Sequence, residues 1–335
     1  MPAPDPSILP AAYEWQEAVH ELPGGLDLHF GGRLDRVELA YRLAGAGGAP
    51  VVAVLGGISA GRNVFSLQSD APGWWEDAIG PGRALDTDRY RVLGIDFLGG
   101  SHRSTGPDVG QVFPSVSAFD QARLLVALMD RLGIARLRAS LGASYGGMVT
   151  LALAQAHPQR VEHAVVLSAA HRTHPMSTAW RSVQRAIVRY ALGHGEGPRG
   201  LVLARALAMA TYRSAREFEE RFPGQAEATP EGFRFPVESY LLARGESYAA
   251  VYRPEAFVCL SESIDLHRVD PAAIRVPTTL LGVEEDQLVP LADMRQLRDQ
   301  HGGNCSLIEI SSIYGHDAFL KETEVLRDLL ARALD

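Results

Sequence analysis

The stretch Gly142-Ala143-Ser144-Tyr145-Gly146 decides how this chain folds. It follows an apolar run, residues 136–141, and it precedes residues 147–156, which have the composition of a helix. A strand that turns sharply into a helix through G-x-S-x-G lifts the serine hydroxyl clear of the backbone, because the glycines let neighbouring elements approach closely. The N-terminus of that helix then favours negative charge beside the hydroxyl. Ser144 is therefore a candidate nucleophile for acyl transfer.

Two later segments supply partners for this serine. G-x-S-x-G also occurs by chance, and this chain has 33 glycines, so the order of the remaining groups along the chain matters. In the alpha/beta-hydrolase arrangement, a carboxylate follows the serine after a later strand, and a histidine follows after the last strand. Residues 275–283 predict a buried strand followed by Asp286, and residues 305–310 predict another followed by His316. Asp286 and His316 are thus the expected partners of Ser144.

Composition limits the class of protein. A chain of 335 residues can bury one large core with an inserted segment, or it can form two domains. The hydrophobic content of 46% and the charged content of 21% are typical of a soluble globular protein. The net charge of -8 and the lack of a Lys/Arg block argue against a nucleic-acid-binding surface. We expect no nucleic-acid partner.

The compartment is predicted from cysteine use and from the hydropathy of the chain. Cys259 and Cys305 lie in mainly apolar runs that predict burial, and two cysteines do not indicate a disulfide framework. No signal-peptide pattern begins the sequence, and no run approaches the ~20 apolar residues that a membrane span needs. The histidines show no metal-ligand spacing. The sequence predicts a cytoplasmic protein without membrane association or a metal.

The order of the predicted elements indicates a doubly wound alpha/beta sheet. The first fifty residues alternate polar and apolar positions, which predicts antiparallel edge strands. Residues 50–55 and 91–96 are continuously apolar, as in central parallel strands that are covered on both faces. A helix is expected over residues 120–132, ending at Gly133. Strands that alternate with helices in this way predict a mostly parallel sheet with helices on both faces.

An inserted block interrupts this alternation. Residues 173–266 are mostly helical in pattern and lie between predicted strands, so we expect a lid over the strand ends. The catalytic domain would then comprise residues 1–172 and 267–335. An oxyanion site needs a second backbone donor from the loop after the third strand, here residues 55–61. We assign the two donors to Tyr145 and Gly57.

Several further stretches carry a resemblance to a known family. Their sequences are Gly73-Trp74-Trp75, Ile79-Gly80-Pro81-Gly82, Leu85-Asp86-Thr87-Asp88-Arg89-Tyr90, Leu98-Gly99-Gly100, Ser104-Thr105-Gly106-Pro107 and Tyr314-Gly315-His316-Asp317-Ala318-Phe319-Leu320. Together they resemble the homoserine O-acyltransferases of the alpha/beta-hydrolase superfamily, which acylate homoserine with acetyl-CoA or succinyl-CoA on the way to methionine. Within the acidic tripeptide 284–286, the spacing of this family favours Asp286. The resemblance also implies acyl-CoA as cosubstrate, no bound cofactor and a homodimer.

The resemblance further implies residues that bind the acceptor. Arg205 and Tyr212 match a family segment that contributes an arginine and a tyrosine to the substrate pocket, and Asp317 matches an aspartate that contacts substrate. An arginine fork suits the carboxylate of homoserine, and an anion suits its ammonium group. From the residues alone, Arg205 is instead a solvated helix residue and Asp317 an N-cap. The chain departs from the family at Ala143 and Tyr145, where glycine and methionine are common, and its lid is shorter.

Three functions remain open at this point. The first is acyl transfer to homoserine, with serine as an alternative acceptor, since serine acylation is a known variation in the family. The second is an esterase-type hydrolase on the same triad, in which water takes the acyl group. The third is a non-catalytic protein on the same scaffold, which ranks last because no triad member is missing. The spacing does not distinguish acetyl from succinyl donors.

Overall fold

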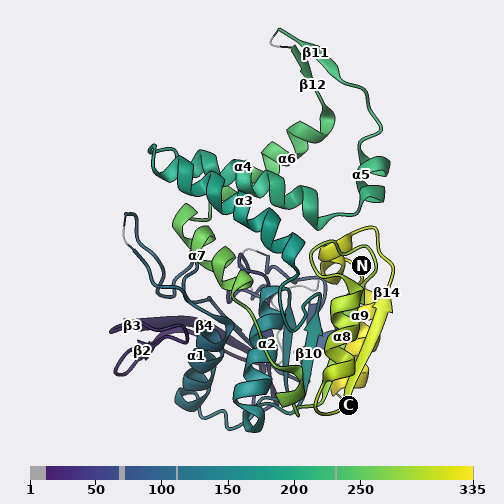
Figure 1. Cartoon of the computed structure of the whole chain (residues 1–335). Coiled ribbons are helices and arrows are strands. Elements are labelled where there is room, and N and C mark those ends of the chain that lie inside the picture. The colour runs from purple at the N-terminus through teal and green to yellow at the C-terminus, as the bar shows by residue number, and fades with distance from the viewer. Residues whose placement is uncertain (1–12, 68–71, 111, 231, 335) are drawn as a thin grey trace.

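The centre of the protein is an eight-stranded sheet, as seen in a computed structural model that describes residues 13–67, 72–110, 112–230 and 232–334 (Figure 1). Its N-terminal edge is antiparallel and the remainder is parallel. In order across the sheet, the strands are β1 (Tyr13–Leu22), β4 (Val37–Ala46), β8 (Arg91–Ile95), β5 (Val51–Leu55), β9 (Ala139–Ala143), β10 (Ala164–Leu167), β13 (Thr278–Val283) and β14 (Cys305–Ile310). This topology confirms the predicted mostly parallel sheet.

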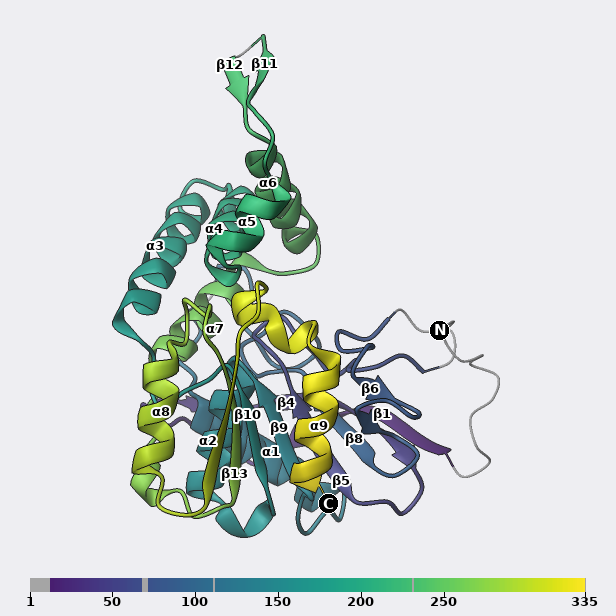
Figure 2. The ribbon, with the colours of Figure 1, turned by 90° about the vertical axis from the view of Figure 1, so that its right-hand side faces the viewer.

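Helices cover both faces of the sheet. Helices α1 (Ala118–Arg131), α2 (Tyr145–Ala156) and α8 (Leu291–Gln300) pack on one face, and α9 (Thr323–Leu334) packs on the other (Figure 2). Strand β5 shows why a continuous apolar run is needed, because its alternate residues enter the two different cores and all are buried. The predicted central strands and the two-sided arrangement are therefore confirmed.

Local signals set where some of these elements begin. Helix α1 starts two residues before the predicted position because Ser117 and Asp120 form a reciprocal capping box. Strand β13 starts at Thr278, three residues after the predicted start at Arg275. Short two-stranded sheets pair β2 (Leu26–Asp27) with β3 (Arg33–Leu34) and β6 (Ile79–Gly80) with β7 (Leu85–Asp86); 3₁₀ helices span Pro158–Arg160, Pro271–Ala273 and Gly315–Leu320.

The segment between β10 and β13 forms a separate helical layer above the ends of the parallel strands (Figure 1). It contains α3 (Pro175–Leu192), α4 (Gly197–Tyr212), α5 (Ala215–Arg221), α6 (Pro236–Ala249) and α7 (Pro254–Asp265). Helices α3 and α4 pack together, α6 packs on α4, and α7 lies between α3 and the sheet. We call this layer the helical insertion.

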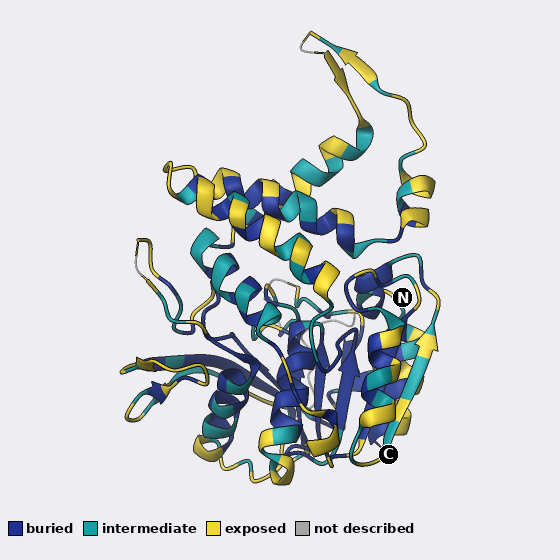
Figure 3. Cartoon of the chain, in the orientation of Figure 1, coloured by how far each residue is buried: buried dark blue, intermediate teal, exposed yellow. Residues whose placement is uncertain are grey.

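One part of the helical insertion was not predicted. Strands β11 (Glu227–Thr229) and β12 (Gly232–Arg234) form a hairpin that projects away from the rest of the protein (Figures 1 and 2). Its side chains are mostly exposed, in contrast to the buried central sheet (Figure 3). Three-residue strands are too short to show an alternating pattern, so only the fold reveals them.

Candidate active site

Ser144 lies at the turn between β9 and α2, with backbone angles of φ 55° and ψ -119°. A non-glycine residue with positive φ is uncommon, and such strain concentrates at functional sites. The turn points the side chain of Ser144 away from the strand and toward the helical insertion, where it contributes to two cavities. The structure thus places Ser144 as the sequence predicted.

The glycines of the motif are required by close backbone approach. A Cβ atom on Gly146 would lie 2.0 Å from the carbonyl oxygen of Leu55, and one on Gly142 would lie 2.2 Å from the carbonyl oxygen of Gly146. The N–H of Gly146 also donates a hydrogen bond of 2.8 Å to the carbonyl of Gly56. The turn after β9 is therefore packed directly against the loop after β5.

Ser144, His316 and Asp286 form a continuous hydrogen-bonded chain. The Nε2 atom of His316 lies 2.9 Å from Oγ of Ser144, and its Nδ1 atom lies 2.7 Å from Oδ2 of Asp286. The other oxygen of Asp286 accepts hydrogen bonds from the backbone N–H groups of Leu288 and Val289, at 2.8 and 3.0 Å. These bonds hold the carboxylate in place. With Nδ1–H donating to Asp286, Nε2 is free to accept the proton of Ser144.

The surroundings of His316 change its affinity for protons. Burial by itself lowers the pKa of His316, but the charge and hydrogen bond of Asp286, with a contribution from Asp317, raise the pKa above its usual value. A raised pKa favours the imidazolium form. A histidine that acts as general base becomes imidazolium once it has taken the serine proton, so this environment suits that role.

The structure also distinguishes the three neighbouring carboxylates. Glu285 accepts hydrogen bonds from the hydroxyl of Ser311, at 2.5 Å, and from the backbone of Ser312, at 2.8 Å. Glu285 therefore binds the loop after β14. Burial raises the pKa of Glu285, but these hydrogen bonds outweigh burial, and its pKa is lowered. Asp286 is the one of the three that contacts His316.

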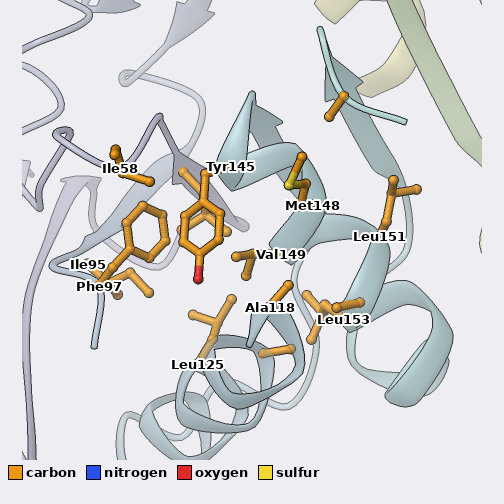
Figure 4. Close-up of a cluster of buried hydrophobic side chains, with 14 of the residues drawn as sticks. Ile58, Ile95, Phe97, Ala118, Leu125, Tyr145, Met148, Val149, Leu151 and Leu153 are labelled. Atoms are coloured by element: carbon orange, nitrogen blue, oxygen red, sulfur yellow. The ribbon is translucent and has the colours of Figure 1, made fainter. Parts of the chain in front are cut away.

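Tyr145 offers a backbone N–H beside Ser144, and its side chain contacts the helical insertion. As the first residue of α2, its N–H has no acceptor among the described residues, and neither has that of Gly57, so both remain candidate oxyanion donors. The side chain is fully buried and its ring meets Phe97 edge to face at 5.0 Å (Figure 4). Its hydroxyl lies 2.7 Å from the hydroxyl of Ser263 on α7 and 3.3 Å from the Gln121 amide nitrogen. No spacing in the sequence indicated this link to the helical insertion.

Arg205 is partly buried and enclosed by aromatic rings rather than solvated. Its guanidinium lies over the rings of Tyr212 and Tyr248, at 5.1 and 4.7 Å from their centroids, and it donates a hydrogen bond of 3.4 Å to the Tyr212 hydroxyl. Burial alone lowers its pKa, but the two tyrosines and Asp317 together raise it. No carboxylate lies within ion-pair distance of Arg205 in the described part of the chain, although Arg205 faces the same cavity as Ser144.

Asp317 lies beside the triad but already has a partner. Its carboxylate forms an ion pair of 3.2 Å with Arg213, which also contacts Glu217 at 3.3 Å. Asp317 lies in the second position after Gly315 of a 3₁₀ helix, so it is not the N-cap, which is Tyr314. Arg213 was not predicted, because nothing in its spacing along the chain distinguishes it from the other arginines of the insertion.

Ser144 and His316 lie between two cavities. We call the wider one the outer cleft; its lining includes Gly57, Trp74, Arg205, Arg244, Asp317 and Lys321. We call the more enclosed one the inner chamber; its lining includes Met148, Arg181, Gln184, Ser261, Leu288 and Asp293. Ile58 and Tyr212 contribute to both. The side chain of Ser144 therefore borders both cavities.

The described residues were not found to hold a metal cluster, a membrane-spanning helix or a disulfide. In residues 13–67, 72–110, 112–230 and 232–334, no three His, Cys, Asp or Glu side chains are grouped so that they could hold a metal ion. None of the helices in these ranges is both long and apolar enough to cross a bilayer. Cys259 and Cys305 are free thiols, and both are only partly buried, so the predicted burial is incomplete.

The fold and this site define an alpha/beta hydrolase with a serine, histidine and carboxylate at the ends of parallel strands. The family described as the alpha/beta hydrolase fold matches residues 50–323. The chain is 44% identical over 299 residues to a homoserine O-succinyltransferase of Xanthomonas campestris pv. campestris, covering 89% of this chain and 79% of the relative. It is 34% identical to a serine O-succinyltransferase of Litchfieldella anticariensis, covering 94% and 97%. The chain belongs to the homoserine O-acyltransferase family of this fold.

A solved structure agrees on the fold. The homoserine O-acetyltransferase from Bacillus anthracis superimposes with a TM-score of 0.86, at 19% sequence identity, over 96% of this chain and 99% of that chain. The match extends over the sheet and the helical insertion together. At this identity it concerns the backbone arrangement alone.

Proposed function

We propose that this protein transfers an acyl group from acyl-CoA, through an ester on Ser144, to the hydroxyl of L-homoserine, as in methionine biosynthesis. The observation that carries the proposal is the partly buried guanidinium of Arg205, which has no carboxylate partner among the described residues and faces the outer cleft next to Ser144 and His316. A partly buried cation without an anionic partner is unfavourable, and the carboxylate of an amino acid would supply that partner. An esterase acting on neutral esters has no need of such a group.

The first half-reaction uses the triad directly. Nε2 of His316 takes the proton from Ser144 as Oγ attacks the thioester carbonyl, and the backbone N–H groups of Tyr145 and Gly57 stabilise the oxyanion. The C–S bond then breaks, and His316 returns the proton to the departing thiolate of coenzyme A. Asp286 holds the imidazole in the correct tautomer throughout.

The second half-reaction repeats these steps with an alcohol. The hydroxyl of homoserine gives its proton to His316 and attacks the acyl carbon, after which the Ser144 ester breaks and Ser144 recovers the proton. Arg205 would bind the carboxylate of homoserine, Tyr212 would line its path, and Asp317 would share its charge between Arg213 and the ammonium group. These contacts place the alcohol ahead of water at the acyl carbon.

We propose that residues 173–266 form a lid on a catalytic domain of residues 1–172 and 267–335. The insertion supplies Arg205 and Tyr212 to the cleft, and its α7 lies over the sheet. A lid of this kind would keep water from the acyl-enzyme. A homodimer and a cytoplasmic location remain predictions from the sequence.

Serine is a second candidate acceptor, because one relative acylates serine according to its name. Serine is one methylene shorter than homoserine. A pocket discriminates between two substrates that differ by one methylene by only about 1–3 kcal/mol. Both acceptors therefore belong in the test.

The experiment measures both products of each half-reaction. Purified protein is mixed with acetyl-CoA or succinyl-CoA, and free thiol and O-acyl amino acid are followed with homoserine, with serine and without an acceptor. We expect thiol and O-acylhomoserine to form in equal amounts. Thiol release that homoserine does not accelerate and that yields free acid would instead identify a hydrolase.

A further inference from the structure

The order of the two half-reactions determines where the acyl group must lie. Nε2 of His316 exchanges a proton with the departing coenzyme A in the first step and with the acceptor in the second. Coenzyme A must therefore leave from the same position beside Nε2 at which the acceptor later enters. Coenzyme A is too large for the inner chamber, so both must use the outer cleft, where Arg205 also lies. The rest of the acyl group, on the opposite side of the acyl carbon, is then directed into the inner chamber.

The inner chamber is lined by an amide side chain that has no partner among the described residues. Gln184 of α3 is only 4% exposed, yet its side chain makes no hydrogen bond with any described residue. Its amide oxygen and nitrogen keep some accessible surface, so they open on the chamber rather than being sealed in the core. The Gln184 amide is therefore available to a ligand in the chamber.

The charges next to Gln184 do not balance. Asp265 of α7 is shared by two arginines of α3: Nε of Arg181 lies 2.8 Å from one carboxylate oxygen, and Nη1 of Arg185 lies 2.5 Å from the other. The three side chains are 9–11% exposed. Two guanidinium groups and one carboxylate leave one positive charge in excess, which is unfavourable in a buried position.

Arg181 is the member of this cluster that can act on a ligand. It lines the inner chamber together with Ser144, whereas Arg185 is held by the backbone and hydroxyl of Ser261, at 3.0 and 3.1 Å. The positive charge of Arg181 is close enough to lower the pKa of His316, so it lies within electrostatic range of the triad. The other charged pair of the chamber, Arg172 with Asp293 at 3.2 Å, is balanced.

We propose that the inner chamber binds the tail of the acyl group and that Arg181 and Gln184 select a tail that ends in a carboxylate. The inference rests on the proposed function and extends it to the donor, which would be the CoA thioester of a short dicarboxylic acid such as succinate. An acetyl group would leave the Gln184 amide unpaired and the excess positive charge uncompensated. A terminal carboxylate would accept hydrogen bonds from the amide and balance the charge.

Donor competition tests this assignment. The unmodified protein is assayed with succinyl-CoA and acetyl-CoA at saturating homoserine, and kcat/KM is compared between donors for Arg181→Gln, Arg181→Lys and Gln184→Leu. We expect the unmodified protein to prefer succinyl-CoA. On the alkaline plateau of the pH profile, Arg181→Gln should lower kcat/KM for succinyl-CoA by about tenfold to a hundredfold, as for loss of one charge-assisted hydrogen bond, and leave acetyl-CoA nearly unchanged. Arg181→Lys should retain part of the preference.

Two comparisons make the result decisive. Arg189→Gln removes a guanidinium from the same helix, where it pairs with Glu262 at 3.1 Å outside the chamber, and should change neither donor. Gln184→Leu should reduce the succinyl preference severalfold, and it keeps the test valid if Arg181→Gln does not fold. A preference for acetyl-CoA in the unmodified protein, or equal losses with both donors in both variants, would overturn the proposal. Failure of the proposed function is distinguishable, because then neither donor would acylate homoserine.

Discussion

The hydroxyl of Tyr145 on α2 and the hydroxyl of Ser263 on α7 lie 2.7 Å apart and are both buried. Tyr145 directly follows Ser144, the candidate nucleophile, and Ser263 belongs to the helical insertion. The turn that carries Ser144 is thereby attached to the layer that covers it. This contact depends on the tyrosine found where the family commonly has methionine.

Removing one hydroxyl of this pair should destabilise the protein. Tyr145→Phe and Ser263→Ala each leave a buried partner unsatisfied, so each should cost about 1–3 kcal/mol. The double variant should cost less than the sum, because neither partner is then left unpaired. Urea denaturation of the three variants measures this coupling, and strict additivity would show that the two hydroxyls do not interact.

Ser144→Ala should abolish transfer while the protein stays folded. Removing the nucleophile of a triad lowers turnover by several orders of magnitude, and the smaller side chain relieves no packing contact. Free thiol is followed after rapid mixing with acyl-CoA, and circular dichroism checks the fold. Turnover near that of the unmodified protein, in a folded variant, would show that Ser144 is not the nucleophile.

Among the adjacent carboxylates, Asp286→Asn should reduce kcat by about 10⁴-fold, because asparagine stabilises the wrong tautomer of His316. Glu285→Gln is the matched control: it contacts Ser311 and Ser312 and should affect thermal stability more than rate. Steady-state rates and melting temperatures separate the two effects. Equal rate losses would mean that the carboxylate has been assigned incorrectly.

Arg205 and Asp317 should serve the acceptor rather than the formation of the acyl-enzyme. Arg205→Met and Asp317→Asn are expected to retain the first burst of thiol from Ser144 and to lose transfer to homoserine. Lys321→Met, at the exposed edge of the same cleft, serves as a charge-loss control. Burst amplitude and steady-state turnover are measured together; loss of the burst in either variant would assign that residue to the acyl step.

The pH dependence of the rate should follow His316. Only the neutral imidazole can accept the serine proton, and its pKa is raised above the usual value of about 6.5, so kcat/KM should fall as pH decreases through a value above 6.5. Asp286→Asn removes the main raising influence and should move the acidic limb of its residual activity to lower pH. Arg181→Gln removes a lowering influence and should move that limb to higher pH. Shifts in the opposite directions would contradict this account of the site.

The elements of the sheet were predictable because their signals are local. Residues 50–55 could be recognised as a buried strand since each residue must be apolar to pack on one face or the other. The turn at Ser144 was predictable because glycines at both ends permit an approach that a Cβ would prevent. The hairpin of β11 and β12 was not, because its strands are too short to show a period.

The sequence by itself was enough to predict Ser144 as nucleophile, His316 as its base and the alternation of strands and helices, since these predictions depend on short patterns and on the topology of a parallel sheet. Tertiary structure alone decided which charges are paired: Asp317 has Arg213, Arg205 meets tyrosine rings and no carboxylate of the described residues, and Arg181 shares Asp265 with Arg185. These partners lie as many as 104 positions apart, as between Arg213 and Asp317. Ion pairing depends on distance in space and on burial, neither of which is encoded by spacing along the chain.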